Sequence, residues 1–433
     1  VRMTQQEINK KLFDLLNKSV SPFHTVMASE EQLREAGFEE LQMSQSWVIE
    51  PKGKYYLKHH DSSLVAFTVG ERAAYGGAFR IAAAHTDFPC LHLKPRPEVT
   101  CESYGQVNIE VYGGAILNTW LDRPLSMAGK VALKSADIFH PEVRFLDVKD
   151  KLFTIPNLAI HMNREVNDGV ALNKQVDMLP LTTIVKDELE KKNFMMSYLA
   201  KKLGCEIEDI LDYELSIYCA EEPCYIGMNE EFISASRLDD VNSIQALISG
   251  LIEGTNANGY NMIALFNHEE IGSSTKQGAG SALLNSIIEK ILIANGRTPE
   301  QVIESMYDSI LLSVDVAHAL HPNKPGKMDI TNKPVLNGGI IIKEACAQTY
   351  ATDCEAVAIV QQLCQADDIP FQKFVNRSDE RGGGTLGAIA SAQLPVKTID
   401  VGVPLLAMHS AKELMGADDE YAMYRLVRAF FSK

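Results

Sequence analysis

The sequence predicts an α/β protein with a mixed, mostly parallel sheet that is flanked by helices and carries an inserted β-rich domain. Apolar strand-like runs alternate with helix-like stretches over residues 232–433, which is the order expected for a parallel sheet covered on both faces. Between residues 96 and 231 the pattern changes to short segments of alternating apolar and polar residues. The chain of 433 residues is also too long for one ordinary hydrophobic core. We therefore expect one α/β domain formed by residues 1–95 and 232–433, with residues 96–231 inserted as a second domain.

The N-terminal part is expected to begin with an amphipathic helix. Thr4 and Glu7 have the spacing of a capping box, and apolar residues follow at helical intervals. A proline within residues 21–24 is expected to end this helix, so a second one is placed near residues 29–36. The apolar runs that follow predict strands over 54–59, 64–69 and 79–84.

The inserted region and the C-terminal part differ in their expected elements. In the insertion, alternation predicts strands over 107–112, 130–133 and 158–161, with one helix over 193–203. After it, the longer periodic stretches predict helices near 240–253, 281–295, 354–366 and 418–431. Apolar runs predict strands over 262–266, 310–314, 335–342 and 371–375, with a final run over 401–408.

Composition limits the compartment and the kind of partner. The net charge of −16 opposes binding to nucleic acid or to an anionic membrane surface. No stretch approaches the roughly 20 apolar residues of a membrane span, and the pattern of a signal peptide is missing, so we expect a cytoplasmic protein. The eight cysteines form no C-x-x-C pair, which indicates neither a disulfide framework nor a thiolate zinc site.

The chemistry of the chain is expected at the end of one apolar run. Residues 262–266 read as a buried strand, and two adjacent carboxylates, Glu269 and Glu270, follow shortly after it. Neighbouring residues of a strand point to opposite faces, so both carboxylates can serve one site only if the strand has already ended. Gly272 fits such an ending. Taken alone, such a pair is far more often two solvated glutamates at a strand exit than a functional site.

Potential metal ligands also stand at or just after the ends of other predicted strands and at the start of one predicted helix. The further candidates are His85, Asp87, Asp239, Asp315 and His409. The carboxyl ends of parallel strands meet at one edge of a sheet, where α/β proteins place their sites. Two histidines with three carboxylates suit two zinc ions that share a bridging carboxylate and leave room for water. One of the two adjacent glutamates would then bind metal, and the other would act as a base.

Each of these residues also has a structural explanation. A single histidine after a strand is often a structural residue, and Asp239 with Asp240 also suits a helix cap. The H-E-x-x-H motif of single-zinc proteases is absent, because Gly272 stands where its second histidine would be. Residues 382–387 formally fit G-x-G-x-x-G, but the surrounding βαβ context is poor, so a flexible loop near the substrate explains them better than nucleotide binding.

These residues, in this order, resemble the aspartyl aminopeptidase family of dinuclear zinc exopeptidases, peptidase family M18. The resemblance implies the sheet of the zinc exopeptidases, with residues 96–231 as a dimerisation domain. The motifs that carry it cover nearly the whole chain and are Ser21-Pro22-Phe23-His24, His85-Thr86-Asp87, Lys94-Pro95, Val111-Tyr112-Gly113-Gly114, Thr119-Trp120, Asp122-Arg123, NLAIHMN over 157–163, Arg237-Leu238-Asp239, Glu269-Glu270-Ile271-Gly272-Ser273, SVDVAHALHPN over 313–323 and Met408-His409-Ser410.

The resemblance implies a role for each metal ligand. His85 and Asp315 would bind one zinc ion, and Glu270 and His409 the other. Asp239 would bridge them, giving two Zn²⁺ per subunit. Cobalt or manganese can enter sites of this kind.

The resemblance further implies the catalytic groups and the assembly. Glu269 becomes the general base, and Asp87 orients the imidazole of His85. His161, in the inserted domain, would reach the site of a neighbouring subunit and steady the tetrahedral intermediate. The family assembles as a tetrahedral dodecamer built from dimers, so a homo-oligomer is expected.

Two residues are expected to contact the peptide substrate. Lys343 follows the predicted strand 335–342 and could pair with an acidic side chain. His318 lies close to Asp315 and is expected to contact the substrate or a metal ligand.

Some positions depart from the family pattern. They are Phe88 in place of a small serine, Asp240 in place of asparagine, Lys412 in place of arginine, and the loop 378–384. None removes a metal ligand, so the departures concern substrate preference and subunit contacts.

The expected function is that of a metallo-aminopeptidase that removes N-terminal residues, with Asp or Glu as the expected preference, by attack of metal-bound hydroxide. A dizinc amidohydrolase or carboxypeptidase would share the metals but need a cationic group for the substrate's C-terminal carboxylate. A non-catalytic assembly or cargo protein would keep the fold but lose a ligand or the base. All five expected ligands and Glu269 are present, which favours the enzyme.

Overall fold

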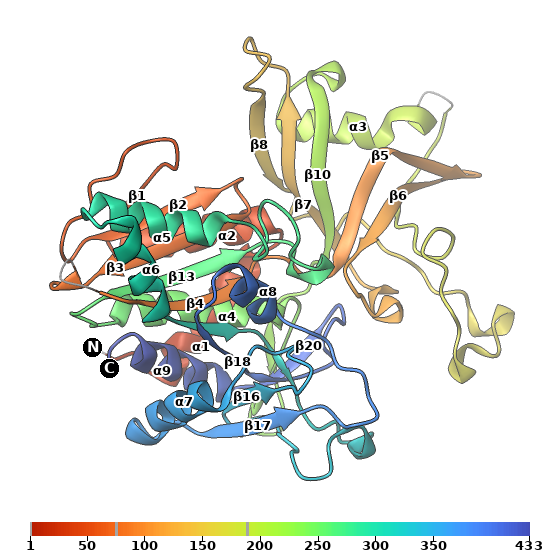
Figure 1. The fold of residues 1–433 in the computed structure, drawn as a ribbon. Coiled ribbons are helices and arrows are strands. Elements are labelled where there is room, and N and C mark those ends of the chain that lie inside the picture. Colours follow the sequence, from red (N-terminus) through yellow and green to blue (C-terminus); the bar gives the residue numbers. More distant parts are fainter. Residues whose placement is uncertain (1, 74–76, 188–189) are drawn as a thin grey trace. The chain divides into compact units, whose positions relative to one another are not determined.

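The computed structural model describes residues 2–73, 77–187 and 190–433. The chain divides into two units, each drawn in Figure 1. Unit 1 consists of residues 1–87, 223–408 and 413–433. Unit 2 consists of residues 88–222 and the short segment 409–412.

Unit 1 is organised around a mixed sheet (Figure 1). Five of the eight neighbouring strand pairs found in the described residues are parallel, and three are antiparallel. The predicted mixed, mostly parallel sheet is therefore confirmed. In spatial order the nine described strands are β1 (Glu39–Glu40), β2 (Lys54–His59), β3 (Ser63–Val69), β13 (Tyr260–Phe266), β4 (Phe79–His85), β14 (Ile310–Val314), β18 (Lys397–Gly402), β16 (Ile340–Glu344) and β17 (Phe371–Val375).

Helices cover both faces of this sheet. On β13, Ile263 and Leu265 belong to an apolar cluster that includes residues of α1, α2, α4, α7 and α9, whereas Met262 and Ala264 belong to a second cluster that includes residues of α5, α6 and α8. This alternation follows from the two-residue period of a strand, and it explains why the central strands are apolar on both faces. The helices are α1 (Gln5–Lys18), α2 (Pro22–Glu35), α4 (Leu238–Glu253), α5 (Leu283–Ala294), α6 (Pro299–Tyr307), α7 (Cys354–Ala366), α8 (Leu386–Gln393) and α9 (Asp419–Phe430).

The first two helices show one correct and one wrong prediction. The predicted capping box is present, since the Thr4 hydroxyl accepts the N–H of Glu7 at 3.3 Å and the Glu7 carboxylate accepts the N–H of Thr4 at 2.7 Å. The second helix, however, begins at Pro22 rather than near residue 29. Pro22 occupies the first helical position, where its missing N–H costs no hydrogen bond, and Ser21 caps the helix by accepting the N–H of His24.

Unit 1 contains a second, smaller sheet of five described strands. The predicted final run 401–408 is divided between β18 and β19. The strand predicted over 335–342 begins only at Ile340, because Asn337 and Gly339 adopt positive φ angles of 61° and 91° in a turn. The strands of this second sheet, in order, are β11 (Cys224–Ile226), β12 (Phe232–Ala235), β20 (Glu413–Gly416), β19 (Pro404–Leu406) and β15 (Ala317–His318).

Unit 2 is an antiparallel sheet with one long helix, α3 (Glu190–Leu203), packed against it. The predicted helix over 193–203 is therefore present. The strand predicted over 158–161 is wrong, because residues 160–162 form the 3-10 turn η3 (Ile160–Met162). Alternation of apolar residues predicts a strand only where a neighbouring strand supplies hydrogen bonds. The strands of the sheet are β8 (Glu142–Asp147), β7 (Leu125–Leu133), β10 (Ile210–Cys219), β5 (Cys90–Cys101), β6 (Tyr104–Tyr112) and β9 (Leu181–Ile184).

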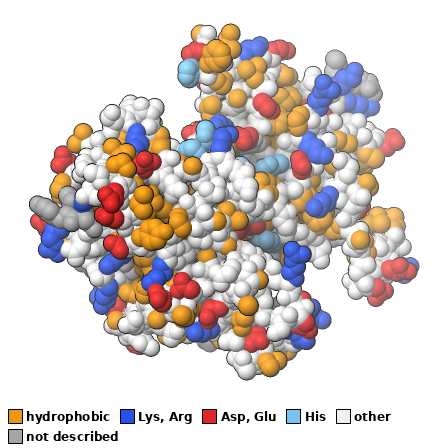
Figure 2. Space-filling view, viewed as in Figure 1, with side chains coloured by type: hydrophobic (Ala, Val, Ile, Leu, Met, Phe, Trp, Pro, Cys, Tyr) orange, Lys and Arg blue, Asp and Glu red, His pale blue; other side chains and the backbone are white. Residues whose placement is uncertain are grey.

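The surface carries charges of both signs. Figure 2 shows Asp, Glu, Lys and Arg side chains interspersed over the viewed face rather than gathered by sign. In the described part of the chain, no helix has the length and apolar character that crossing a bilayer requires.

Candidate metal centre

Three neighbouring strands of unit 1 bring the candidate residues to one edge of the main sheet. β13, β4 and β14 lie side by side and run parallel, so their carboxyl ends meet. His85 is the last residue of β4, and Asp315 directly follows β14. Glu269 and Glu270 follow the end of β13 after two intervening residues.

The exit from β13 explains how two adjacent glutamates face one site. His268 adopts a left-handed conformation with φ 63°, and the short 3-10 turn η6 (Glu269–Ile271) follows it. Gly272, with φ 105°, ends that turn. Because the strand has already ended, Glu269 and Glu270 no longer alternate between faces, as the sequence predicted.

Asp87 holds this turn and the imidazole together. One of its carboxylate oxygens accepts the N–H of Glu269 and the other accepts the N–H of Glu270, each at 3.1 Å. The same carboxylate lies 3.3 Å from Nδ1 of His85, and the Asp87 carbonyl lies 2.9 Å from that nitrogen. Asp87 is fully buried, so its position is set by these contacts rather than by solvent.

The start of α4 supplies two further carboxylates. Arg237 adopts a left-handed conformation before the helix, and the peptide bond between Asp239 and Asp240 is cis. The N–H of Asp239 donates to the buried Glu413 carboxylate at 3.0 Å. Glu413 lies on β20, which pairs with the strand β12 that leads into this turn. Glu413 therefore fixes the backbone that carries Asp239.

Nε2 of His85 lies within 4 Å of four carboxylates of the cluster. It lies 3.2 Å from Asp239 Oδ1 and 3.6 Å from Asp315 Oδ1. Glu269 Oε2 and Asp240 Oδ2 lie 3.8 and 3.9 Å away. Glu270 offers a carboxylate oxygen within 4.8 Å of ligand atoms of His85 and Glu269.

Burial and like charges shift the pKa values of these groups. Burial raises the pKa of Glu269 to about 8; His85 opposes this effect, and Asp315 adds to it. Burial likewise raises the pKa of Glu270 and of Asp240 well above the usual range. Burial acts to lower the pKa of His85, but Asp240 and Glu269 outweigh it and raise the value. So much negative charge in a buried place calls for cations.

Two buried polar atoms test whether a metal fits this cluster. Among the described residues, neither Nε2 of His85 nor Oδ1 of Asp240 makes a hydrogen bond, although both are buried. Buried polar atoms normally have a partner, and an imidazole nitrogen among carboxylate oxygens is a donor set that zinc accepts. The residues present therefore fit a divalent metal.

Lys343 is placed differently from the sequence expectation. It lies within β16 rather than after it, and its side chain is buried, with 1% exposed. Its ammonium group donates to the carbonyl of Val316 at 3.1 Å and lies 3.5 Å from that of Asp315. Burial acts to lower the pKa of Lys343, but Asp315 and Asp400 outweigh it, so the pKa is raised and the charge is retained. Its contact with substrate stays a prediction.

His318 lines a cavity of about 350 Å³ in unit 1. His318 is exposed, and the centroid of its ring lies 5.8 Å from that of Phe374, which also lines the cavity. Lys324, Lys327 and Arg377 also line the cavity. The predicted substrate contact of His318 is untested by this geometry and stays a prediction.

His409 and His161 belong to unit 2. Nδ1 of His409 lies 3.1 Å from the carbonyl of Gly114 in the same unit. His161 is exposed within η3. The roles expected for these two histidines stay predictions.

Two residues of the cluster were not foreseen as members of it. From the sequence, Asp240 was expected only as a helix cap and as a departure from the family pattern, although its position next to Asp239 could have indicated a place in the cluster. Glu413 has no comparable signal, because its link to Asp239 is made by strand pairing between distant segments.

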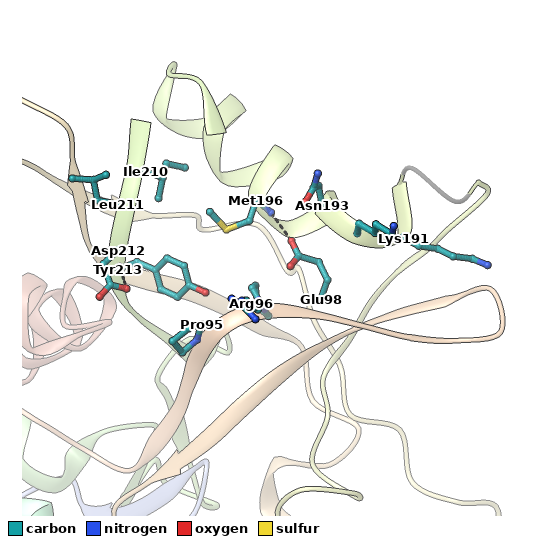
Figure 3. A pocket seen from close by; sticks show the side chains of 12 residues that line it. Pro95, Arg96, Glu98, Lys191, Asn193, Met196, Ile210, Leu211, Asp212 and Tyr213 are labelled. Atoms are coloured by element: carbon teal, nitrogen blue, oxygen red, sulfur yellow. Dashed lines mark hydrogen bonds between the residues drawn. The ribbon is translucent and has the colours of Figure 1, made fainter. Parts of the chain in front are cut away.

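Another cavity, of about 570 Å³, lies in unit 2 between α3, β5 and β10 (Figure 3). Its charged lining is mixed, with Arg96 and Lys191 as cations and Glu98 and Asp212 as anions. None of the expected site residues lines it. The candidate chemistry therefore lies at the sheet edge of unit 1.

The fold and the buried cluster together define a metalloenzyme with an α/β catalytic unit. The family model for aminopeptidase I zinc metalloprotease (M18) matches residues 15–431. A probable M18 family aminopeptidase 2 of Clostridium acetobutylicum is 44% identical over 427 residues, which are 98% of this chain and 99% of that protein.

Solved structures agree with this match. The structure of the Ape4 and Nbr1 complex aligns with a TM-score of 0.92 at 31% identity, over 99% of this chain and 86% of that one. The S. cerevisiae mApe1 dodecamer aligns with a TM-score of 0.83 at 26% identity, over 99% and 96% of the two chains. The chain belongs to the M18 family and is a zinc metallo-aminopeptidase, a hydrolase.

Proposed function

We propose that this aminopeptidase works with two divalent metal ions and with Glu269 as its general base. The observation that supports this proposal is the cluster around Nε2 of His85, in which one imidazole nitrogen without a hydrogen bond lies within 4 Å of four carboxylates. Four carboxylates buried this close together would be strongly unfavourable without a cation.

The metal ligands follow the family motifs. His85 and Asp315 would hold one ion, Glu270 and His409 would hold the other, and Asp239 would be shared by the two. Zinc is the expected metal, and cobalt or manganese can replace it in a site of nitrogen and oxygen donors.

The residues of the chain then have separate tasks in hydrolysis. When bound, the two cations supply Lewis acidity at the substrate carbonyl and increase the acidity of a water molecule. Glu269 accepts the proton of the attacking water and passes it to the leaving amine. Asp87 keeps Glu269, Glu270 and His85 in register through its contacts at 3.1–3.3 Å. His161 of a neighbouring subunit steadies the developing oxyanion.

The preferred substrates are peptides with an N-terminal Asp or Glu. Lys343 supplies the positive charge for this preference, because its ammonium group stays protonated next to Asp315. The three cationic residues that line the cavity of His318, namely Lys324, Lys327 and Arg377, add positive potential in the same unit.

The working form is a homo-oligomer, with a dodecamer built from dimers as the expected state. The similar yeast protein is described as a dodecamer, and residues 96–231 are the dimerisation domain that the family motifs imply. The eight free cysteines of the described structure and the net charge of −16 support a location in the reducing cytoplasm.

The experiment compares the wild type with Glu269→Gln on aminoacyl anilides and on N-acylated peptides. We expect wild-type cleavage of the free-amine substrates only, and a loss in kcat of about 10²–10⁴-fold for Glu269→Gln with its metal content unchanged. The exposed Glu289→Gln serves as the control and should keep full activity. Cleavage of the blocked peptides alone would favour an amidohydrolase or carboxypeptidase, and near-normal turnover of Glu269→Gln would remove Glu269 from the mechanism.

A further inference from the structure

Asp240 is a buried carboxylate that the mechanism above does not use. Its side chain is 0% exposed, and its Oδ2 accepts the N–H of His85 at 3.2 Å. Its Oδ1 makes no hydrogen bond among the described residues. In the set His85, Asp239, Asp240 and Asp315, one ligand atom from each residue lies within 4.8 Å of the others.

A structural role explains only part of this arrangement. An amide oxygen would accept the His85 N–H as well as a carboxylate does, without a buried negative charge. Asp240 has non-helical backbone angles, so it lies before the regular part of α4. The Ser243 hydroxyl interacts with the Asp240 carboxylate and favours its charged form, but it brings no positive charge. The second oxygen and the charge therefore remain unexplained by packing.

We propose that Asp240 is a further metal-binding residue, which gives the ion held by His85 and Asp315 a third carboxylate. This inference rests on the proposed metal centre and adds a ligand to it. One imidazole nitrogen with three carboxylates is an oxygen-rich donor set, and such sets suit Mn²⁺, which accepts six ligands, better than the four-ligand sites of zinc do. The site should therefore bind Mn²⁺ more tightly, relative to Zn²⁺, than the same site without Asp240.

The surrounding charges are consistent with an extra anion at this position. Lys343, which is fully buried in unit 1, interacts electrostatically with both Asp315 and Asp240. Its ammonium group lies 3.5 Å from the Asp315 carbonyl. The charge of Lys343 partly offsets that of the third carboxylate. The negative charge that is left in the cluster would attract a divalent ion.

Metal affinities of the full-length protein test the proposal. The wild type and Asp240→Asn are stripped with a chelator, and Mn²⁺ and Zn²⁺ binding is measured separately by calorimetry in competition with a chelator of known affinity. Asp240→Asn keeps an acceptor for the His85 N–H. We expect it to lower Mn²⁺ affinity about 10–100-fold and Zn²⁺ affinity less than about tenfold. The exposed Asp308→Asn is the control and should change neither affinity.

The outcomes separate this inference from the proposed metal centre. Equal losses for the two metals, or no loss, would overturn the role of Asp240 while leaving the centre intact. A wild type that binds neither metal would overturn the centre itself. If Asp240→Asn does not fold, a crystal structure of the wild type with Mn²⁺, located by its anomalous scattering, decides the matter. An Asp240 oxygen bonded to the ion supports the proposal, and an Asp240 carboxylate outside its coordination sphere refutes it.

Discussion

At the scale of residues, the site depends on carboxylates whose surroundings differ although their chemistry is the same. Asp87 is satisfied by two backbone N–H groups, whereas Asp240 retains an oxygen without a hydrogen bond. Glu269 and Glu270 are adjacent in the chain, and the left-handed turn at His268 places both on one side. Hydrogen bonds to backbone donors therefore distinguish a carboxylate that orients its neighbours from one that is available to a cation.

Lys343 gives a prediction about substrate preference. Lys343→Met keeps the apolar stem but removes the charge. We expect kcat/KM for Asp and Glu anilides to fall about 10–100-fold, because a charged hydrogen bond is lost, while Leu anilide changes less than about threefold. Equal losses on all three substrates would show that Lys343 only supports the backbone at Val316 and Asp315.

Glu420 gives a prediction about stability and pH. It is 0% exposed in α9, and neither carboxylate oxygen makes a hydrogen bond of standard geometry among the described residues. Burial, aided by Asp419, raises the pKa of Glu420 well above its usual 4.5. The folded state then binds this proton more tightly than the unfolded state, so the associated stability is present below pH 4.5 and is lost as pH rises towards the folded pKa.

Glu420→Gln should remove the contribution of Glu420 to the pH dependence of the free energy of unfolding. We expect the free energy of unfolding of the variant to exceed that of the wild type by about 1–3 kcal/mol at pH 8 and to differ little from it at pH 4.5. Denaturant unfolding at both pH values measures this difference. Asp419, whose pKa burial raises to about 7, is present in both proteins. A gain of the same size at both pH values would contradict the prediction.

At the scale of elements, α8 shows how a helix is fitted against the sheet. A Cβ atom at Gly387 would lie 2.7 Å from an Asp400 oxygen and 2.7 Å from Ser313. Asp400 is itself anchored, because it accepts the Thr385 hydroxyl at 2.6 Å and the N–H of Ala351 at 2.7 Å. The first turn of α8 can approach β14 and β18 this closely only with glycine at this position.

Gly387→Ala should therefore destabilise unit 1 by about 1–3 kcal/mol through overpacking. Gly383→Ala is a matched control in the preceding loop, because a Cβ there meets nothing within 4 Å, and it should stay within about 0.5 kcal/mol of the wild type. Denaturant unfolding of both variants measures the difference. Similar stabilities for the two variants would show that the neighbours of Gly387 move aside at no cost.

Elements with a strong local pattern were predicted well, and those set by their surroundings were not. β14 and α7 have the predicted bounds, since each is a clear apolar or periodic run between polar residues. The start of α2 was missed because a proline ends one helix and can equally begin the next. Residues 158–161 alternate like a strand, but their backbone forms a 3-10 turn instead.

At the scale of the whole molecule, the role proposed for His161 makes activity a property of the assembly. His161→Ala should lower kcat about 10²–10³-fold, the usual loss for one group that stabilises an oxyanion. Mixing it with Glu269→Gln, after dissociation and reassembly, should restore measurable activity. In such a mixture a subunit with intact Glu269 can receive His161 from its neighbour.

The control mixes the two variants as preformed assemblies without dissociating them. Because no assembly then contains both kinds of subunit, this mixture should remain inactive. An assay of Asp anilide hydrolysis follows both mixtures. Reassembled mixtures that stay inactive would show that His161 acts within its own subunit, or not in catalysis at all.

The sequence by itself determined the fold class, the family and the strand ends at which His85, Glu269, Glu270 and Asp315 lie. These features are local, because each depends on an apolar run and on the polar residues that directly follow it. Only the tertiary structure decided that Asp87 binds both glutamate N–H groups, that Lys343 is buried and donates to the carbonyl of Val316, and that one Asp240 oxygen makes no hydrogen bond among the described residues. Those contacts join segments far apart in the chain, and their geometry follows from the packing of neighbouring strands and helices rather than from any local pattern.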